Sequence, residues 1–293
     1  MEKAKVYFTK EITPEAVVRL YNALGIKLPG KVAVKVHSGE KGNQNFLRPA
    51  FMEPMIKAVN GTVVECNTAY EGARNTTEKH KALFAEHGWS ELFDVDIMDA
   101  EGPDLVWPIE GGKALKENHV GRGILAYDSM LVLSHFKGHP MGGYGGAIKQ
   151  LSIGCASNAG KCLIHSAGEN AIEAKFWDHV AEQDTFCEAM AEAAGTVMQH
   201  FAGKIAFVNV AVNLSVDCDC CAVAEDPCMK DLGIFASLDP VAIDQACIDM
   251  VAQSDDPGRD HFMERVTSRH GTHTIDAADA IGYGTKHYEL IEL

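Results

Sequence analysis

The chain has 293 residues, of which 46% are hydrophobic and 23% charged, a composition typical of a globular protein with a substantial core. Its formal net charge of −15 disfavours contact with nucleic acid and with anionic membranes, and no apolar run approaches the ~20 residues of a membrane span. The start, MEKAKVYF, has no apolar stretch of the kind found in signal peptides, so we expect a cytoplasmic protein.

The first third of the chain alternates strand and helix patterns. The predicted strands are AKVYF (4–8), KVAVKV (31–36) and TVVEC (62–66). Thr13 followed by Pro14 is typical of a helix start, residues 50–59 are predicted to be helical, and Thr76 or Thr77 could cap a third helix. This βαβαβα order predicts an α/β fold with mainly parallel sheets covered by helices.

The remaining elements are less regular. The predicted strands are FDVDIM (93–98), LVWPI (105–109), MLVLSHF (130–136), KIAFVNVAV (204–212), IFASL (234–238) and the final HYELIEL. Residues 170–201 are predicted to be a long helical region with a break near Gln183, and Asp239-Pro240 is typical of a helix start. We expect a single domain over residues 1–293, which could contain sub-lobes 1–125 and 126–293 and could form a homo-oligomer.

A glycine-rich segment, HFKGHPMGGYGGAIKQLSIGCASNAGKCLIH (135–165), follows an apolar strand. Ligands of open α/β sheets bind beyond the carboxyl ends of the strands, and glycines let the backbone approach a ligand or cofactor closely. If AIKQL opens a helix, its N-terminus would attract anions, and Lys149 could bind an anion, a carbonyl or a cofactor. The candidate cofactor-binding residues are Gly142, Gly143, Gly145, Gly146 and Lys149.

The same segment contains His139 and His165, which together with Lys149 are the predicted catalytic residues. Imidazoles can transfer protons or ligate a metal. The alternative is that the glycines only form tight turns and that the histidines lie in the core or on the surface. The segment lacks both the dinucleotide-binding and the P-loop pattern.

The chain contains nine cysteines, which in a cytosolic protein are thiols, metal ligands or buried hydrophobic residues. The loop VDCDCCAVAEDPC (216–228) holds Cys218 and Cys220, a Cys-x-Cys pair that could chelate a soft metal or join an iron–sulfur cluster. The usual zinc pair is Cys-x₂-Cys. The alternative is a loop of thiols packed beside a site. Cys66, Cys187 and Cys247 are predicted to lie in the core.

Two polar loops, 34–49 and 65–80, follow the second and third strands and could converge on one crevice. Arginine can hold a carboxylate or phosphate bidentately, and histidine or glutamate can act as a ligand or a proton carrier. The predicted substrate-binding residues are Arg74, His37 and Glu40, with Arg48 and His80 as further candidates. The alternative for each is a solvated loop position.

With these residues in view, the chain resembles the domain-of-unknown-function family 362, whose members are often described as iron–sulfur centre proteins. The matching segments are VKVHSGEKGN (34–43), NTAYEGARN (67–75), LSHFKGHPMGGYGGAIKQLSIGCASNAGK (133–161), the CDC at 218–220 and GIFASLDPVAIDQA (233–246). Many members carry an inserted pair of ferredoxin-type clusters before the strand that leads to CDC. Here residues 176–192 are predicted to form a short helical connection instead, so the resemblance implies a member without that electron-transfer module.

The glycine-rich segment is also similar to the core motif of lactate racemase and its relatives, which implies a lactate-racemase-like scaffold. In those enzymes a lysine tethers a nickel pincer cofactor, a later histidine ligates nickel and an earlier histidine moves protons. The matching residues here are Lys149, His165 and His139. A second acid/base histidine of the relatives is replaced by Ala73, whereas Arg74 beside it could still bind a substrate carboxylate.

Three hypotheses follow. The leading one is a metal- or cofactor-dependent enzyme, an isomerase or an oxidoreductase, that acts on a small anionic molecule and holds a divalent metal, an iron–sulfur cluster or a nickel pincer cofactor. Its predicted metal ligands are His165, Cys218 and Cys220. The second is a non-enzymatic metal or iron–sulfur protein that uses the two cysteines, with a ferredoxin-type redox partner. The third is a small-ligand binding protein that has lost its activity.

Overall fold

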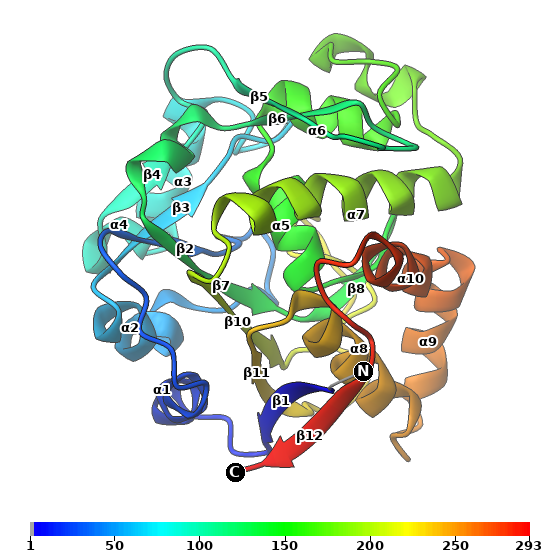
Figure 1. Ribbon diagram of the computed structural model, residues 1–293. Coiled ribbons are helices and arrows are strands. Elements are labelled where there is room, and N and C mark those ends of the chain that lie inside the picture. The colour runs from blue at the N-terminus through cyan, green and yellow to red at the C-terminus, as the bar shows by residue number, and fades with distance from the viewer. Residues whose placement is uncertain (1–2) are drawn as a thin grey trace.

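A computed structural model describes residues 3–293 and contains one eight-stranded sheet in the order β12-β1-β11-β10-β7-β2-β3-β4 (Figure 1). Strand β11 is antiparallel to both of its neighbours, and the other neighbouring pairs of this sheet are parallel. The predicted α/β fold with a mainly parallel sheet is therefore confirmed. The strands are β1 Ala4–Thr9, β2 Val32–Lys35, β3 Gly61–Glu65, β4 Val95–Ile97, β7 Ser129–His135, β10 Ile205–Ala211, β11 Gly233–Ser237 and β12 Tyr288–Glu292.

Two short antiparallel ribbons stand outside this sheet. One pairs β5 (Leu105–Pro108) with β6 (Glu117–Val120), and the other pairs β8 (Lys137–His139) with β9 (Gly143–Gly145). In the second ribbon His139 faces Gly143, and Lys137 faces Gly145. Neither β6 nor this second ribbon was predicted, because ENHV, KGH and GYG contain no run of apolar or β-branched residues.

Helices cover both faces of the sheet (Figure 1). Alternate residues of each strand point to opposite faces, so each face has its own hydrophobic core. One core packs against α1 and α2, and the other packs against α5, α7 and α8. The helices are α1 Pro14–Ala23, α2 Pro49–Ala58, α3 Thr77–Glu86, α4 Trp89–Leu92, α5 Ala147–Cys155, α6 Asn158–His165, α7 Gln183–His200, α8 Pro240–Ala252, α9 Arg259–Ser268 and α10 Gly271–Ile281, with 3₁₀ turns at Arg122–Ala126 (η1) and Glu173–Asp178 (η2).

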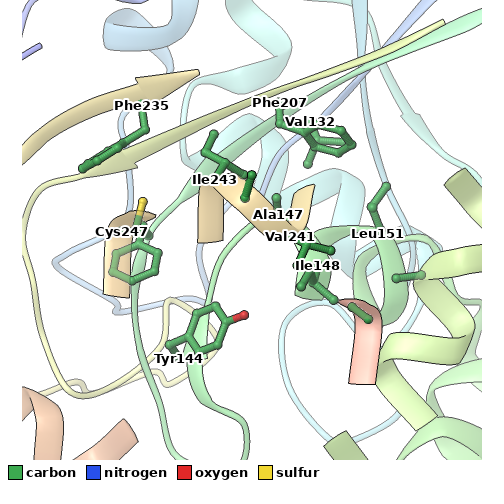
Figure 2. Packing of buried hydrophobic residues seen from close by; sticks show 14 of the residues in the cluster. Val132, Tyr144, Ala147, Ile148, Leu151, Phe207, Phe235, Val241, Ile243 and Cys247 are labelled. Carbon is green, nitrogen blue, oxygen red and sulfur yellow. The ribbon is translucent and has the colours of Figure 1, made fainter. Parts of the chain in front are cut away.

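The second of these cores fixes helix α5, which carries Lys149. Figure 2 shows side chains of the sheet beside those of α5 and α8, among them Val132, Phe207, Ala147, Ile148, Val241 and Ile243. These residues are fully buried. Because burial of one large apolar side chain contributes roughly 1.5–3 kcal/mol to the stability of the fold, these contacts hold α5 firmly against the sheet.

Most predicted helix boundaries are confirmed. Thr13 Oγ1 accepts a hydrogen bond from Ala16 N (3.1 Å), and Asp239 Oδ1 accepts from Val241 N (2.9 Å). The predicted break near Gln183 is confirmed, because α7 begins at that residue, but the first part of the region predicted over 170–201 holds only the 3₁₀ turn η2. Upstream, the Asn170 side chain bonds the backbone of Ile172 and Lys175. A side chain that satisfies local backbone groups in this way competes with helix formation.

The main sheet combines strands from the whole chain. Strand β2 pairs with β7, so residues 1–125 and 126–293 share one sheet. A division into sub-lobes stays a prediction. Among the helices of residues 3–293, none has both the length and the apolar character needed to cross a bilayer.

Candidate functional site

A cavity of about 530 Å³ lies beyond the carboxyl ends of β2, β3 and β7, where an open α/β sheet binds its ligands. The three predicted catalytic residues, Lys149, His139 and His165, all line it. Arg74 and His37 from the two polar loops line it as well, and the cysteine loop contributes Cys220. Four separate segments of the sequence therefore meet at one cavity.

Positive charge dominates the wall of this cavity. Six cationic side chains line it, against a single carboxylate, that of Glu65; the cations are Lys35, Arg74, Lys137, Lys149, Lys161 and Arg269. The chain as a whole carries a formal charge of −15, so the cavity has the opposite sign to the rest of the protein. Low-dielectric walls that carry one sign of charge concentrate ligands of the other sign.

Three of the cations form buried ion pairs. Lys137 lies 3.1 Å from Asp219, and Arg74 lies 3.1 Å from Glu40. Lys35, which is only 1% exposed, lies 3.8 Å from Glu65. Burial would raise the pKa of Glu65, but the charge of Lys35 and the hydrogen bond from His80 together outweigh it and hold that pKa below the ordinary range.

The other three cations lack such a partner. Within residues 3–293 no carboxylate lies within 4 Å of the charged nitrogens of Lys149, Lys161 or Arg269. The Lys161 ammonium donates instead to the carbonyl of Ala156 (2.6 Å). The cavity therefore holds positive charge that the described residues do not balance.

Two further donors at the cavity are unsatisfied. Arg74 Nη2 and Gln150 Nε2 are buried and have no hydrogen-bond partner among the described residues. A buried donor without a partner costs about 1–3 kcal/mol, so such groups in a cavity indicate a ligand with acceptor atoms.

His139 presents an N–H group at its free nitrogen. Its Nδ1 accepts hydrogen bonds from the backbone N–H groups of Met141 (3.1 Å) and Gly142 (2.8 Å), which assigns the proton of the neutral ring to Nε2. Nε2 lies 3.7 Å from Cys220 Sγ. Burial, together with the charge of Lys149, lowers the pKa of His139 to about 4, so the ring is neutral at physiological pH.

His165 has the opposite arrangement. Its Nδ1 donates to the carbonyl of Lys161 (2.7 Å), which leaves Nε2 as an acceptor with no protein partner among the residues described. The ring packs between Phe176 and Phe186, with centroid distances of 4.7 and 4.9 Å. Burial lowers the pKa of His165 to about 4. A neutral imidazole with a free lone pair suits a proton acceptor or a metal ligand.

Lys149 acts on all the imidazoles of the cavity. Burial makes the largest contribution to the lowered pKa values of His37, His139 and His165, and the positive charge of Lys149 lowers each of them further. The Lys149 ammonium therefore lies close enough to influence all three rings.

The start of α5 is already occupied by a carboxylate of the protein. Asp244 accepts hydrogen bonds from Ala147 N (2.8 Å) and Ile148 N (3.0 Å), and also from Asn209 and Tyr144. The prediction that this helix start would attract a ligand anion is wrong for these two N–H groups. A Cβ atom at Gly146 would lie 2.4 Å from Asp244 Oδ1, which explains a glycine there.

The four candidate glycines differ in position. Gly145 and Gly146 line the cavity, whereas Gly142 and Gly143 are not part of its wall. Gly142 N supports His139, as described above. Gly143 has φ +77°, and a Cβ atom there would lie 2.9 Å from the backbone of Gly271. Two of the four glycines therefore shape the ribbon rather than the cavity.

The cysteine loop meets the ribbon at a cluster of candidate metal ligands. One ligand atom from each of His139, Cys218 and Cys220 lies within 4.8 Å of the others, so these residues could hold a metal ion. The two thiols suit a soft metal. The imidazole does not suit one, because a metal-bound histidine donates its second N–H to an acceptor, whereas His139 Nδ1 accepts from two donors.

His165, predicted as the third ligand, lies outside this cluster although it lines the same cavity. All nine cysteines are free thiols, and burial raises the pKa of Cys218 to about 11. Cys66, Cys187 and Cys247 are buried, as predicted for core residues.

The two polar loops converge, as predicted. Arg74 Nη1 lies 3.4 Å from His37 Nε2, and both side chains line the cavity. Glu40 instead lies behind Arg74 and is not part of the wall. His80 is buried against Glu65 (2.9 Å), and the exposed Arg48 lies over the ring of Phe46. Neither His80 nor Arg48 lines the cavity.

Sequence reasoning missed most of the cations. Lys35 and Lys137 occupy positions at or just beyond the ends of buried strands, VAVK and SMLVLSH-FK, where an apolar residue is the usual choice. A lysine in such a position could have indicated a functional site from the sequence. Lys161, Gln150 and Arg269 lie on helices or just after one, and nothing in their local pattern distinguishes them from surface residues.

Two solved structures match part of the chain. The structure is similar to lactate racemase apoprotein from Thermoanaerobacterium thermosaccharolyticum (TM-score 0.41, 13% identity, 70% of this chain and 50% of that one). It is also similar to a structural-genomics protein from Thermotoga maritima (TM-score 0.42, 13% identity, 67% and 49%). The match thus spans about half the length of each of these proteins. No curated protein matches the chain.

The family described as "Domain of unknown function (DUF362)" matches residues 32–249. This range includes both polar loops, the glycine-rich segment and the cysteine loop. The resemblance stated from the motifs is thereby confirmed, and the chain belongs to the DUF362 family.

Proposed function

We propose that the chain is an enzyme that moves a proton on a small anionic substrate bound in the 530 Å³ cavity. The observation that supports this most is the pair of neutral imidazoles with opposite hydrogen bonding on a wall rich in cations. His165 has a free lone pair, and His139 has an N–H with only the Cys220 sulfur nearby. A base and a donor beside an anion site are the groups that proton abstraction next to a carboxylate or phosphate requires.

Each residue has a distinct role in this proposal. Arg74 and Lys149 bind the anionic group of the substrate. His165 Nε2 takes a proton from the substrate, and the electron pair of the broken bond stays on the substrate. The N–H of His139 and the charge of Lys149 stabilise the negative charge that develops there. A metal ion on Cys218 and Cys220 would add Lewis-acid stabilisation when bound.

Solvent-isotope exchange tests this proposal. The full chain is incubated in D₂O with a panel of small carboxylates and phosphates, and mass spectrometry follows deuterium uptake into each compound. We expect uptake into at least one, its loss in His165→Gln, and a fall of at least about 10²-fold in His139→Gln. The control is His119→Gln, which lies outside the cavity wall. Uptake that persists in His165→Gln would exclude this residue as the base.

The tautomers themselves can be measured by long-range ¹H–¹⁵N spectroscopy at neutral pH. We expect protonated Nε2 in His139 and protonated Nδ1 in His165, with the two His→Gln variants giving the assignments. The same tautomer in both rings would contradict the assignment of a base and a donor.

The second candidate is a non-enzymatic metal or redox protein, favoured by the proximity of the Cys218 and Cys220 sulfurs. It predicts stoichiometric metal and a visible absorption spectrum in anaerobically purified protein, both absent in the Cys218→Ser, Cys220→Ser double variant. A colourless protein that keeps its metal in that variant would reject it.

A further inference from the structure

We infer that the substrate carries at least two anionic groups, one bound near Arg74 and the other near Lys161. This inference rests on the proposed function, because it takes the cavity as the substrate site. It goes further in stating the charge of the substrate and where each charged group lies.

The number of anionic groups on the substrate follows from the balance of charge in the cavity. Lys35, Arg74 and Lys137 each have a carboxylate within 4 Å, and Lys149, Lys161 and Arg269 have none among the residues that the structure describes. Lys161 is only 6% exposed, so water screens its charge poorly. Arg269 is exposed and water screens its charge, so the balance concerns Lys149 and Lys161. One anionic group would leave one of these two cations without a partner, whereas a dianion matches both.

Asp99, an acid that senses the charge of Lys161, does not alter this balance. Asp99 influences Lys161 from beyond ion-pair distance. Its two oxygens accept hydrogen bonds from Asn67 N (2.9 Å) and Asn158 N (3.2 Å). Asp99 is therefore held by the backbone and leaves the Lys161 ammonium without a close counter-ion.

The position of each anionic group follows from the positions of the cations. Arg74, with its unsatisfied Nη2, lies beside His37. Lys161 lies on helix α6, one turn before His165. Lys149 lines the same cavity as His37 and His165, and its charge lowers the pKa of both rings. A ligand that satisfies both Arg74 and Lys161 needs an anionic group at each end.

Isothermal titration of the full chain with two matched four-carbon acids tests the inference. Succinate carries two carboxylates and butyrate carries one, and both are measured at the same ionic strength because screening weakens charged contacts. We expect succinate to bind at least about 10-fold more tightly than butyrate. Lys161→Gln is expected to weaken succinate at least about 10-fold and to change butyrate by less than about 2-fold. Lys81→Gln, an exposed lysine outside the cavity wall, is the matched control.

Each outcome is decisive. Equal affinity for both acids, with both weakened by Lys149→Met, would overturn the inference and leave the proposed function standing. Binding of neither acid at about 10 mM would overturn both, because the cavity would then not be an anion site. If Lys161→Gln does not fold, Arg269→Gln, an exposed cation of the cavity wall, replaces it, with an expected loss of about 3-fold for succinate alone.

Discussion

The two sides of the cavity use the same residue type for different purposes. His139, on the ribbon of β8 and β9, and His165, at the end of α6, are both buried, and both have a pKa lowered to about 4. Nevertheless His139 offers an N–H and His165 offers a lone pair. Neither burial nor charge distinguishes them, so the partner of Nδ1 decides what each ring can do.

The local backbone supplies these partners. The turn after β8 directs the N–H groups of Met141 and Gly142 at His139, because both follow it within three residues. In α6 the last turn of the helix offers carbonyls instead, and His165 Nδ1 donates to that of Lys161, four residues earlier. A tight turn thus produces a donor to the cavity, and a helix end produces an acceptor.

Loosening α5 should affect both sides of the cavity, because this helix holds Lys149 in the wall that both imidazoles share. Asp244→Ala removes an acceptor from four buried donors, so we expect the free energy of unfolding to fall by about 4 kcal/mol. Urea unfolding measures it. The matched control is Asp244→Asn, which keeps one acceptor oxygen and should lose about half as much. A loss below about 1 kcal/mol in Asp244→Ala would contradict the role of this cap.

The pH dependence of stability should be alike on the two sides. The pKa of each ring is about 6.5 in the unfolded chain and about 4 in the folded one. The stability that each contributes is therefore present above pH 6.5 and is lost as the pH falls through 4, a change of up to about 3 kcal/mol. We expect His139→Gln and His165→Gln each to flatten the fall in unfolding free energy between pH 7 and pH 4 by about 2–3 kcal/mol.

This measurement uses urea unfolding at several pH values, with His119→Gln as the control. If only one of the two variants flattened the profile, the equal burial of the two rings would be contradicted.

Metal binding should depend on the cysteine loop and not on His139, although both belong to the same cluster. Cobalt(II) titrated into the reduced chain should give a thiolate charge-transfer band, and Cys218→Ser should weaken binding at least about 10-fold. His139→Gln should change the affinity by less than about 3-fold, because its Nδ1 accepts from two N–H groups and the proton stays on Nε2. A loss of about 10-fold or more in His139→Gln would show that the ring turns over and ligates the metal.

The smallest effect concerns the mouth of the cavity. Trp177 lines the cavity although its residue surface is 64% exposed, and its neighbour Phe176 is buried against His165. We expect succinate to change Trp177 fluorescence, and Trp177→Ala to abolish that change while weakening succinate by about 2–3-fold. The control is Trp107→Phe, because Trp107 lines a different cavity. An unchanged signal in Trp177→Ala would show that the reporter is another tryptophan.

The sequence was informative about which residues meet, and much less about how they are bonded. Lys149, His139 and His165 occur in one segment after a strong strand, and they line one cavity. The orientation of each imidazole depends on single backbone groups, which no residue pattern specifies. Likewise the local sequence at the start of α5 resembled a ligand anion site. It could not show that Asp244, almost a hundred residues later, occupies this helix start.

The convergence of the two polar loops was predictable, because parallel neighbouring strands end at the same edge of a sheet. The ion pair between Arg74 and Glu40 was not predictable. Because of it, Glu40, which was expected to contact the substrate, supports Arg74 instead. The cationic wall as a whole was missed because its six members come from six different elements or loops, and most of them are individually unremarkable in sequence.

The ribbon of β8 and β9 lies outside the main sheet, and Lys137 and His139 face the cavity from alternate positions of one short strand. A one-residue insertion into β8 would turn these side chains to the opposite side while leaving all eight strands of the main sheet in register. Evolution could therefore silence or retune the chemistry of this scaffold in a single step, at the cost of the buried ion pair between Lys137 and Asp219. A protein engineer could use the same insertion to abolish activity without replacing a reactive side chain.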